Sequence, residues 1–434
     1  MSEGLLPVEP GRQRLLRVDS AVILKRFLYL ERAVIVAAAA WVPAVQRLET
    51  KALLSRSAWE DAETAKALRN RIFELRYPDR TLEPGPEPLV TLFDEALDAP
   101  GPADLLTALA GILFPAQRMA YEDYLEVSDD IADGPTRRFL EVAVKEKAAR
   151  EIALREAAEH EAGTPSEWVA SLRDRLDELS GGSFEPPSPA ETCPPLNGGR
   201  AFSLAQEPAR DPRYFVTPFY WPDALDPGYP YGEGMLLQLR SAVSHLNEVW
   251  AVETAGAVLH AFQRELGWEF LFDAARWLYD ESRHMTMGGR RLAFWGFETA
   301  EIPLGSYIYQ ACRDQDPIYR LAMLAFFETK NIGKKKGRAA TFGGLGDRTS
   351  QRDMDFDWAD EAIHAGYGRR WLRAALEERG EDPESWPELV SRCESLVSER
   401  VAQATDAERR ACMEGAATLV ARAEELCSNL TSSA

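Results

Sequence analysis

The stretch YDESRHMTMG, residues 279–288, contains one of the chain's five histidines, three residues after a glutamate. The same Asp-Glu-x-x-His order returns in WADEAIHAGY, residues 358–367. The matching residues are Asp280, Glu281 and His284 in the first stretch and Asp360, Glu361 and His364 in the second. Residues three apart lie on one face of a helix, so each glutamate and its histidine can point at a single atom. One motif alone would favour exposed Glu–His neighbours on a surface helix, whereas the repetition indicates a shared metal site.

The sequence around both motifs predicts an all-α protein. Alanine, leucine, glutamate and arginine dominate, apolar residues recur every three or four positions, and alternating strand-like runs are nearly absent. Helices are predicted at about 18–48, 56–76, 102–127, 135–162, 165–179, 236–264, 266–290, 315–332, 352–378, 384–404 and 407–427. Residues 333–351 are expected to form a polar connection, in which the basic run Lys334–Lys336 is a solvated loop.

The spacing of two further glutamates completes a ligand set. Two metal ions in a helical bundle are commonly held by a Glu-x-x-His from each of two helices and one glutamate from each of the other two. Each motif should then follow an inward glutamate by roughly 25 to 35 residues. Glu253 and Glu328 meet this requirement within apolar stretches, where a glutamate is seldom buried without a partner. The predicted ligands are Glu253, Glu281, His284, Glu328, Glu361 and His364.

The charges in this set favour metal over a buried salt network. Four carboxylates in one core would repel each other and take up protons, whereas two divalent cations would neutralise them with both imidazoles neutral. Imidazole and carboxylate ligands suit iron or manganese, with zinc as a further option. Asp280 and Asp360 are expected to accept the outer imidazole N–H groups across the bundle and so to fix the rings.

This pattern resembles the ferritin-like diiron-carboxylate superfamily. The doubled Asp-Glu-x-x-His is similar to that of ribonucleotide reductase small subunits and bacterial diiron monooxygenase hydroxylases, and the resemblance covers about residues 236–380. It implies a ferritin-like four-helix bundle with two iron ions, manganese being the alternative, and O2 as co-substrate. Reductase subunits carry a radical tyrosine one turn after the first motif's histidine, where this chain has Gly288. A stable-radical role is therefore not expected.

The resemblance implies a diiron oxidase or oxygenase acting on a small organic substrate, by hydroxylation, N-oxygenation, desaturation or a related oxidation. Because the sequence has no dinucleotide, flavin or iron–sulfur motif, turnover would need an external electron donor such as a reductase or ferredoxin. A metal-handling ferroxidase or peroxidase-type ferritin-like protein is one alternative, which the chain length and the lack of cysteine motifs disfavour. A non-catalytic helical partner protein is another. The substrate and homo-oligomerisation are left open.

The N-terminal half looks like a second, degenerate copy of the bundle. AWEDAETAKALRNRI (58–72) aligns with LYDESRHMTMGGRRL (278–292), which sets Asp61 against Glu281 and Thr64 against His284. Glu31 precedes Asp61 at a similar distance, and Arg150 falls where a ligand histidine would stand. We expect this half to bind no metal and to serve as a scaffold or contact surface. Two unrelated helical bundles of similar composition are the alternative.

Composition limits the classes of protein. A net charge of −20 argues against a general nucleic-acid or anionic-membrane binder. Five scattered cysteines without a C-x-x-C pair fit a reducing compartment. The N-terminus lacks the layout of a signal peptide, and the longest apolar run, residues 33–45, is too short to span a bilayer and is expected to be a core helix. A cytoplasmic protein is expected.

A Pro/Gly-rich segment separates the two halves. Its first part reads as a linker, while its second part is rich in aromatic residues and is expected to pack across a domain surface, a substrate lid being the alternative. The predicted division is an N-terminal degenerate domain at 1–179, a linker and strap at 180–235, a ferritin-like dimetal domain at 236–380 and a C-terminal helical pair at 381–434.

Overall fold

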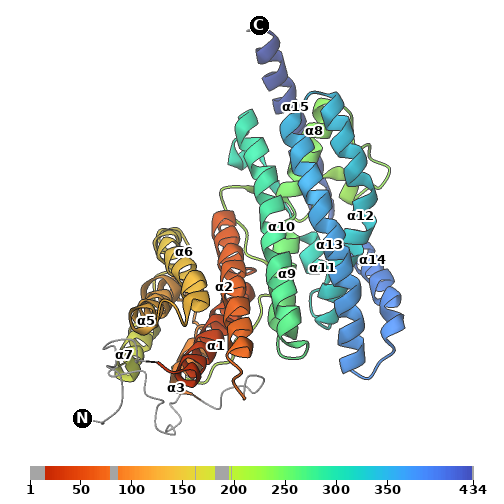
Figure 1. Ribbon diagram of the computed structural model, residues 1–434. Coiled ribbons are helices and arrows are strands. Elements are labelled where there is room, and N and C mark those ends of the chain that lie inside the picture. The colour runs from red at the N-terminus through yellow and green to blue at the C-terminus, as the bar shows by residue number, and fades with distance from the viewer. Residues whose placement is uncertain (1–14, 79–86, 162, 181–194, 197, 433–434) are drawn as a thin grey trace, which may run out of the picture. The chain divides into compact units, whose positions relative to one another are not determined.

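The computed structural model describes the whole chain except residues 1–14, 79–86, 162, 181–194, 197 and 433–434 (Figure 1). The described residues are helical apart from turns, loops and one pair of two-residue strands, which confirms the all-α prediction. No helix among them is both long enough and apolar enough to cross a membrane.

The chain forms two compact units. The N-terminal unit comprises residues 1–37 and 60–202, and the C-terminal unit comprises residues 38–59 and 203–434. This division differs from the one drawn on the sequence, because residues 38–59 group with the C-terminal unit, and so does the C-terminal helical pair. Residues 181–194 and 197 of the expected linker lie outside the described residues.

The N-terminal unit contains the predicted helices and one addition, α3, but the turn between the first two helices lies at residues 42–47 and not at the predicted 49–55. Its elements are α1 (Arg17–Trp41) and α2 (Leu48–Glu74), which both continue into the C-terminal unit, then α3 (Pro88–Asp94), α4 (Pro102–Ala108), the π-helical segment η1 (Leu109–Leu113), α5 (Phe114–Val127), α6 (Gly134–Ala158) and α7 (Glu167–Ser180). The π-helical segment falls just before Pro115, which has no N–H to donate to the carbonyl of Gly111. Arg173 donates to that carbonyl instead, at 3.3 Å.

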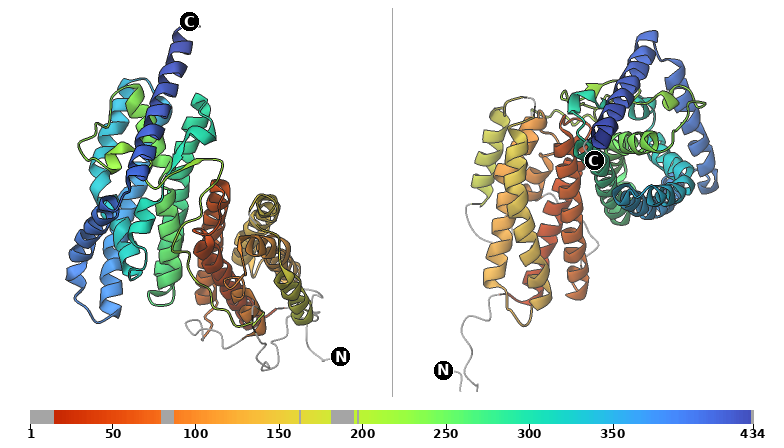
Figure 2. Two further views of the ribbon diagram at one scale, coloured as in Figure 1. Left: turned by 180° about the vertical axis from the view of Figure 1, so that it is seen from behind. Right: turned by 90° about the horizontal axis from the view of Figure 1, so that it is seen from above.

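After residue 203, the described part of the C-terminal unit begins with loops and continues with eight α-helices and some short elements. Its elements after residue 203 are β1 (Phe215–Val216), η2 (Pro222–Ala224), α8 (Met235–Leu246), α9 (Val249–Phe262), α10 (Gly267–Trp295), η3 (Thr299–Glu301), β2 (Pro303–Leu304), α11 (Tyr307–Ala311), α12 (Ile318–Gly344), α13 (Arg348–Glu378), η4 (Pro383–Ser385), α14 (Trp386–Ala402) and α15 (Asp406–Ser432). Helices α9, α10, α13 and α12 pack in a ring, each against the next, and α8 also packs on α10. Figure 2 shows these green-to-blue helices from behind and from above.

Two glycines bring the helices of this ring close together. A Cβ atom on Gly288 would lie 2.2 Å from the backbone nitrogen of Leu246 in α8, and one on Gly368 would lie 2.7 Å from the Cβ atom of Ala325 in α12. Each glycine stands four residues after the histidine of its motif. The close contact at Gly288 leaves no room for a tyrosine side chain, which agrees with the absence of a radical tyrosine at this position.

Two helices of the C-terminal unit also differ from the prediction. The helix expected at 236–264 is broken into α8 and α9 at Asn247 and Glu248. The Asn247 side chain donates to the carbonyls of Val243 at 2.9 Å and Pro303 at 3.0 Å, and it accepts from the backbone N–H of Gly305 at 2.7 Å, so it ties the end of α8 to the strand β2. Helix α12 continues to Gly344 instead of ending near residue 332. The solvated loop expected at Lys334–Lys336 is therefore wrong.

The aromatic segment 211–233, which we call the strap, packs against the C-terminal unit. Phe219, Tyr220 and Trp221 are buried, and β1 pairs in parallel with β2. The backbone N–H of Phe215 donates to the Ile302 carbonyl at 3.0 Å. The strap is thus a packed segment, as the sequence analysis favoured.

Candidate metal centre

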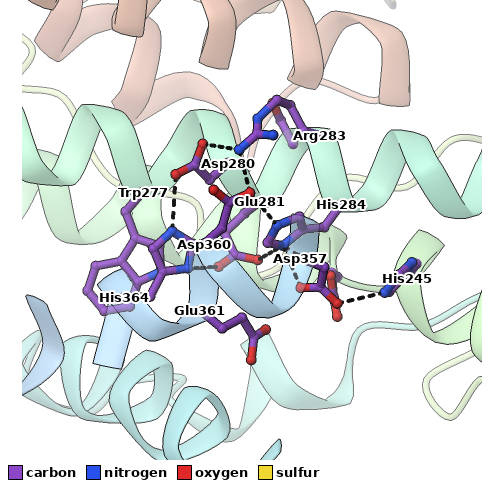
Figure 3. Close-up of polar contacts among 12 residues, drawn as sticks. His245, Trp277, Asp280, Glu281, Arg283, His284, Asp357, Asp360, Glu361 and His364 are labelled. Carbon is purple, nitrogen blue, oxygen red and sulfur yellow. Dashed lines mark hydrogen bonds and ion pairs between the residues drawn. The ribbon is translucent and has the colours of Figure 1, made fainter. Parts of the chain in front are cut away.

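The two Asp-Glu-x-x-His motifs meet inside the C-terminal unit (Figure 3). Helix α10 supplies Glu281 and His284, helix α13 supplies Glu361 and His364, and helix α12 supplies Glu328. All five side chains are buried, with at most 5 % of any residue exposed. Their ligand atoms fall into groups in which each atom lies within 4.8 Å of the others. Five of the six predicted ligands are therefore brought together.

One group, which we call position 1, consists of Glu281, Glu328 and His364. The Nδ1 atom of His364 lies 3.2 Å from Oε1 of Glu281 and 3.5 Å from Oε1 of Glu328. The Trp277 indole N–H donates to both glutamates at 3.1 Å, and its ring stacks on the His364 imidazole. Trp277 therefore holds two carboxylates at a fixed separation on one side of the cluster.

A second set of ligand atoms, which we call position 2, gathers around the Nδ1 atom of His284. Oδ1 of Asp357 lies 3.4 Å from it, Oε2 of Glu248 3.5 Å and Oε2 of Glu281 3.6 Å. Glu361 groups with His284 and Asp357 within 4.8 Å. Because its two oxygens face the two histidines, Glu281 is placed to bridge the two positions.

The aspartate of each motif contacts the histidine of the other. Nε2 of His284 lies 3.3 Å from Oδ2 of Asp360, and Nε2 of His364 lies 3.3 Å from Oδ2 of Asp280. Arg283 donates to both aspartates, at 2.5 Å to Asp360. With Nε2 occupied in this way, each imidazole turns its Nδ1 atom toward the cluster.

Glu253 does not join the cluster, and the sequence prediction of this ligand is corrected. Its Oε1 atom lies 3.0 Å from Nζ of Lys51, and Arg210 donates to both of its oxygens, at 2.5 and 3.0 Å. Glu248 takes the place that had been assigned to Glu253. Their separation of five positions corresponds to about 140° of helix rotation, so the two side chains face different ways.

A sequence signal for Glu248 existed. The same spacing of 33 residues separates Glu248 from Glu281 and Glu328 from Glu361. Glu248 follows the polar residue Asn247 and does not stand within an apolar run, so its neighbours gave no reason to expect it inside the protein. The break between α8 and α9 turns it toward the cluster.

Asp357 and Lys335 are further members of the cluster that the sequence analysis missed. Asp357 lies one turn before Glu361 on the same face of α13. The Nζ atom of Lys335, 4 % exposed, lies 2.7 Å from Oδ1 of Asp357 and 3.6 Å from Oε1 of Glu248, and it also donates to Glu361. A fixed positive charge thus stands beside position 2.

Asp357 is held from its outer side by His245. Arg291 can only donate, and it lies 2.6 Å from Nδ1 of His245, so that atom accepts and the Nε2–H donates to Oδ2 of Asp357 at 2.9 Å. Burial and the nearby Arg291 lower the pKa of His245 to about 3. This imidazole is therefore neutral and fixes the orientation of the Asp357 carboxylate.

The protonation of the cluster without metal follows from its burial. Burial raises the pKa of Glu248 to about 8 and also raises the pKa values of Glu328 and Glu361. The surrounding carboxylates outweigh the effect of burial on His284 and His364, and they raise the pKa of both imidazoles. Protons thus balance the buried negative charge when no cation does.

Two divalent cations would balance the same charge in place of those protons. The cluster contains five carboxylates and one ammonium group, so two such ions bring its charge to zero with both imidazoles neutral. The carboxylates are Glu248, Glu281, Glu328, Glu361 and Asp357, and the ammonium is that of Lys335.

The hydrogen bonds of the cluster provide a test of whether its residues fit metal ions. Buried polar atoms are almost always hydrogen-bonded. Five atoms here are buried without a hydrogen-bond partner, and all five belong to the groups described above. They are Oε2 of Glu248, Oε2 of Glu328, Oε2 of Glu361, Nδ1 of His284 and Nδ1 of His364. Carboxylate oxygens and imidazole nitrogens left without partners at one point are the donor set that divalent transition metals use.

The N-terminal unit contains a buried polar cluster of a different kind. Nζ of Lys147 lies 2.9 Å from Glu31, 2.9 Å from Asp61 and 3.0 Å from the side-chain oxygen of Gln117, and Arg150 donates to Asp61 at 2.6 Å. Lys147 and Arg150 are three residues apart on α6, as Glu361 and His364 are on α13. A lysine ammonium occupies the centre of this cluster and pairs with its two carboxylates.

A cavity of about 680 Å³ in the C-terminal unit reaches the candidate metal centre. Four of the cluster's glutamates line it, and so do residues of the strap and of α14. Its size is in the range of sites for small molecules. Trp250, Phe326 and Phe327 form an aromatic wall, with ring centroids 4.9 Å apart for Trp250 and Phe327.

Comparison with known proteins gives one match. A family described as "Protein of unknown function (DUF455)" matches residues 206–414, which span the strap and every residue of the two metal positions. No curated protein and no solved structure gives a significant match.

Proposed function

We propose that the C-terminal unit is a ferritin-like bundle with a dinuclear metal centre, occupied by iron, that carries out O2-dependent oxidation of a small organic substrate. The observation that supports this most directly is the convergence of five buried ligand atoms that have no hydrogen-bond partner. A structural salt network would leave few such atoms, because each costs about 1–3 kcal/mol when unsatisfied.

The residues divide between two ions. Glu281, Glu328 and His364 would hold the ion at position 1, and Glu281 would be shared with position 2. At position 2 the other ligands would come from Glu248, His284, Asp357 and Glu361. Bound iron would supply the redox chemistry with O2 that none of the chain's own side chains provides.

The chain's own residues would orient and enclose this centre. Asp280 and Asp360 fix the imidazoles, and Trp277 spaces Glu281 from Glu328. The aromatic wall of the cavity would keep bulk water from the substrate side. An external reductase or ferredoxin would supply electrons.

The proposal is tested by mixing anaerobic, Fe(II)-loaded protein with O2 and following absorbance in a stopped-flow instrument. A transient oxidised-iron band at two irons per chain, lost in Glu281→Ala and kept in Asp355→Ala, is expected. Asp355 is an exposed residue of α13 that does not face the cluster, so it serves as the matched control. Slow oxidation of iron far beyond two per chain would instead support the metal-handling alternative, and an absence of bound iron would overturn both.

A further inference from the structure

The cavity over the metal centre carries positive charge at its rim. Five cationic side chains line it in a chain whose net charge is −20. Three of the five are matched by carboxylates. Three hydrogen bonds of 2.8–3.0 Å join Arg240 to Asp223. Lys330 lies 3.5 Å from Glu394, and Lys335 contacts the carboxylates of the cluster.

The other two cations, Lys334 and Arg338, have no carboxylate partner among the described residues. They stand four residues apart on α12, so their side chains are neighbours on the helix surface. Lys334 is exposed, and the Arg338 guanidinium lies 4.0 Å from the centroid of the Tyr231 ring. This pair can bind one anionic group from two sides.

A third polar group is available at the same place. The hydroxyl of Tyr231, a strap residue that lines the cavity, is buried and has no hydrogen-bond partner. Buried hydroxyls are rarely left without partners, so this one indicates a missing acceptor or donor at the tyrosine whose ring the Arg338 guanidinium covers. The unpartnered Tyr231 hydroxyl is an observation independent of the positive charges of Lys334 and Arg338.

Part of the wall of this cavity is apolar. Trp250, Tyr307, Ile308, Phe326 and Phe327 line it and offer two aromatic faces and an aliphatic surface. A ligand that fits both the apolar wall and the two cations would have a flat or apolar body that carries one anionic group. Its body would lie against this apolar part of the wall, and its anion would lie at Lys334 and Arg338.

We propose that the cavity selects a small aromatic acid, meaning an aromatic body with one carboxylate, sulfonate or phosphate group, bound through Lys334, Arg338 and Tyr231. This inference rests on the proposed function for its role as a substrate class, but the binding itself does not require metal. Arg338 and Tyr231 are the specificity-determining pair, because the strap and α12 bring them together.

The test uses two fluorescent probes that differ by one sulfonate, 8-anilinonaphthalene-1-sulfonate and the neutral N-phenyl-1-naphthylamine. Each is titrated into the full-length protein, with and without Mn(II). The wild type is expected to bind the anionic probe at least tenfold more tightly. The double variant Lys334→Gln/Arg338→Gln should lose this preference while its affinity for the neutral probe changes less than twofold, and Tyr231→Phe should weaken only the anionic probe.

Two controls locate the binding. Lys336→Gln removes a neighbouring cation of α12 that does not line this cavity. Arg290→Gln removes a cation from the separate arginine-lined groove beside α10. Both should keep the preference. Equal affinity of the wild type for the two probes, or a preference that survives in the double variant, would overturn the inference.

The two proposals fail separately. A protein that discriminates between the probes but binds no metal would retain the anion site and lose the proposed function. A protein that binds two metal ions but treats the probes alike would retain the metal centre and lose the inference.

Discussion

The Nε2 atom of His284 lies 3.3 Å from Oδ2 of Asp360, a residue of the other Asp-Glu-x-x-His motif. The reciprocal contact joins His364 to Asp280 at the same distance. Each motif therefore orients the histidine of the other motif, and the two helices α10 and α13 are coupled at the candidate metal centre. This explains why both motifs carry an aspartate before the glutamate.

Replacing one of these aspartates should weaken metal binding without removing a ligand. Asp360→Asn keeps the shape but no longer offers a carboxylate to the imidazole N–H. Loss of such a supporting contact typically costs about 10- to 100-fold in metal affinity. Isothermal titration with Mn(II) or Co(II) measures the effect, and Asp355→Asn, an exposed neighbour on α13, is the control. Unchanged affinity in Asp360→Asn would show that the contact does not orient His284.

Lys335 should make position 2 the weaker of the two metal positions. Its ammonium contacts Asp357 and Glu361 and repels a divalent cation placed between them. Lys335→Met should therefore raise the affinity for the second ion by about tenfold or more, which corresponds to about 1.4 kcal/mol. Equilibrium dialysis against Co(II) resolves the two binding steps.

Lys336→Met is the matched control for this change, because Lys336 is exposed on the same turn of α12. Weaker binding of the second ion in Lys335→Met would contradict the prediction and would mean that the lysine supports the ligands instead of competing with the metal.

The limits of the sequence analysis follow from these same residues. Periodicity predicted the helices, and the doubled motif predicted Glu281, His284, Glu328, Glu361 and His364 as neighbours. Both signals depend on the spacing of residues along the helices, so they can be recognised in the sequence alone. The metal content and the reaction remain proposals.

The errors have a tertiary origin. Gly333 and Gly337 indicated a loop, and each costs a helix about 1 kcal/mol relative to alanine. The buried face formed by Lys335, Ala339 and Phe342 outweighs that cost and continues α12. The prediction of Glu253 as a ligand failed because Arg210, from a distant loop, and Lys51, from α2, pair with Glu253. Local sequence patterns do not predict ion pairs with residues so far away in the chain.

In the N-terminal unit, removing the central cation should be strongly destabilising. Lys147→Met leaves Glu31 and Asp61 buried without their shared partner, and breaking a buried ion pair costs about 3–5 kcal/mol. Native-state hydrogen exchange of α6 peptides measures the free energy of unfolding of this unit. Lys145→Met, an exposed change on α6, should alter it by less than about 0.5 kcal/mol. Equal effects of the two variants would contradict a structural role for Lys147.

The stability of the N-terminal unit should fall as pH rises from 5 to 8. Burial raises the pKa of Glu31 from 4.5 to about 7 in the folded protein. The folded state therefore favours the protonated carboxyl, so this contribution is full below pH 4.5 and is lost as pH rises through 7, amounting to about 3 kcal/mol. The pKa of Asp61 is lowered, so its contribution is present above pH 3.8 and changes only below that pH.

Glu31→Gln isolates this effect, because glutamine keeps the shape of the side chain but does not titrate. Its single oxygen can accept from Lys147, and its amide N–H can donate to the Tyr121 hydroxyl. Urea unfolding at pH 5, 6, 7 and 8, followed by pulsed hydrogen exchange of α6, should show a steeper loss of stability in the wild type than in the variant. Parallel curves would mean that Glu31 is ionised in the folded state throughout this range.

The most direct test of the metal centre is the number of metal ions bound at equilibrium. The apo-protein is dialysed anaerobically against Fe(II), and in parallel against Mn(II), and the bound metal is counted by mass spectrometry for the wild type, Glu281→Gln and Glu253→Gln. Two ions per chain are expected in the wild type. Glu281→Gln should lose both, because Glu281 faces both positions, while Glu253→Gln, if folded by circular dichroism, should keep them. A wild type that binds no ion, or a Glu281→Gln variant that still binds two, would contradict the account.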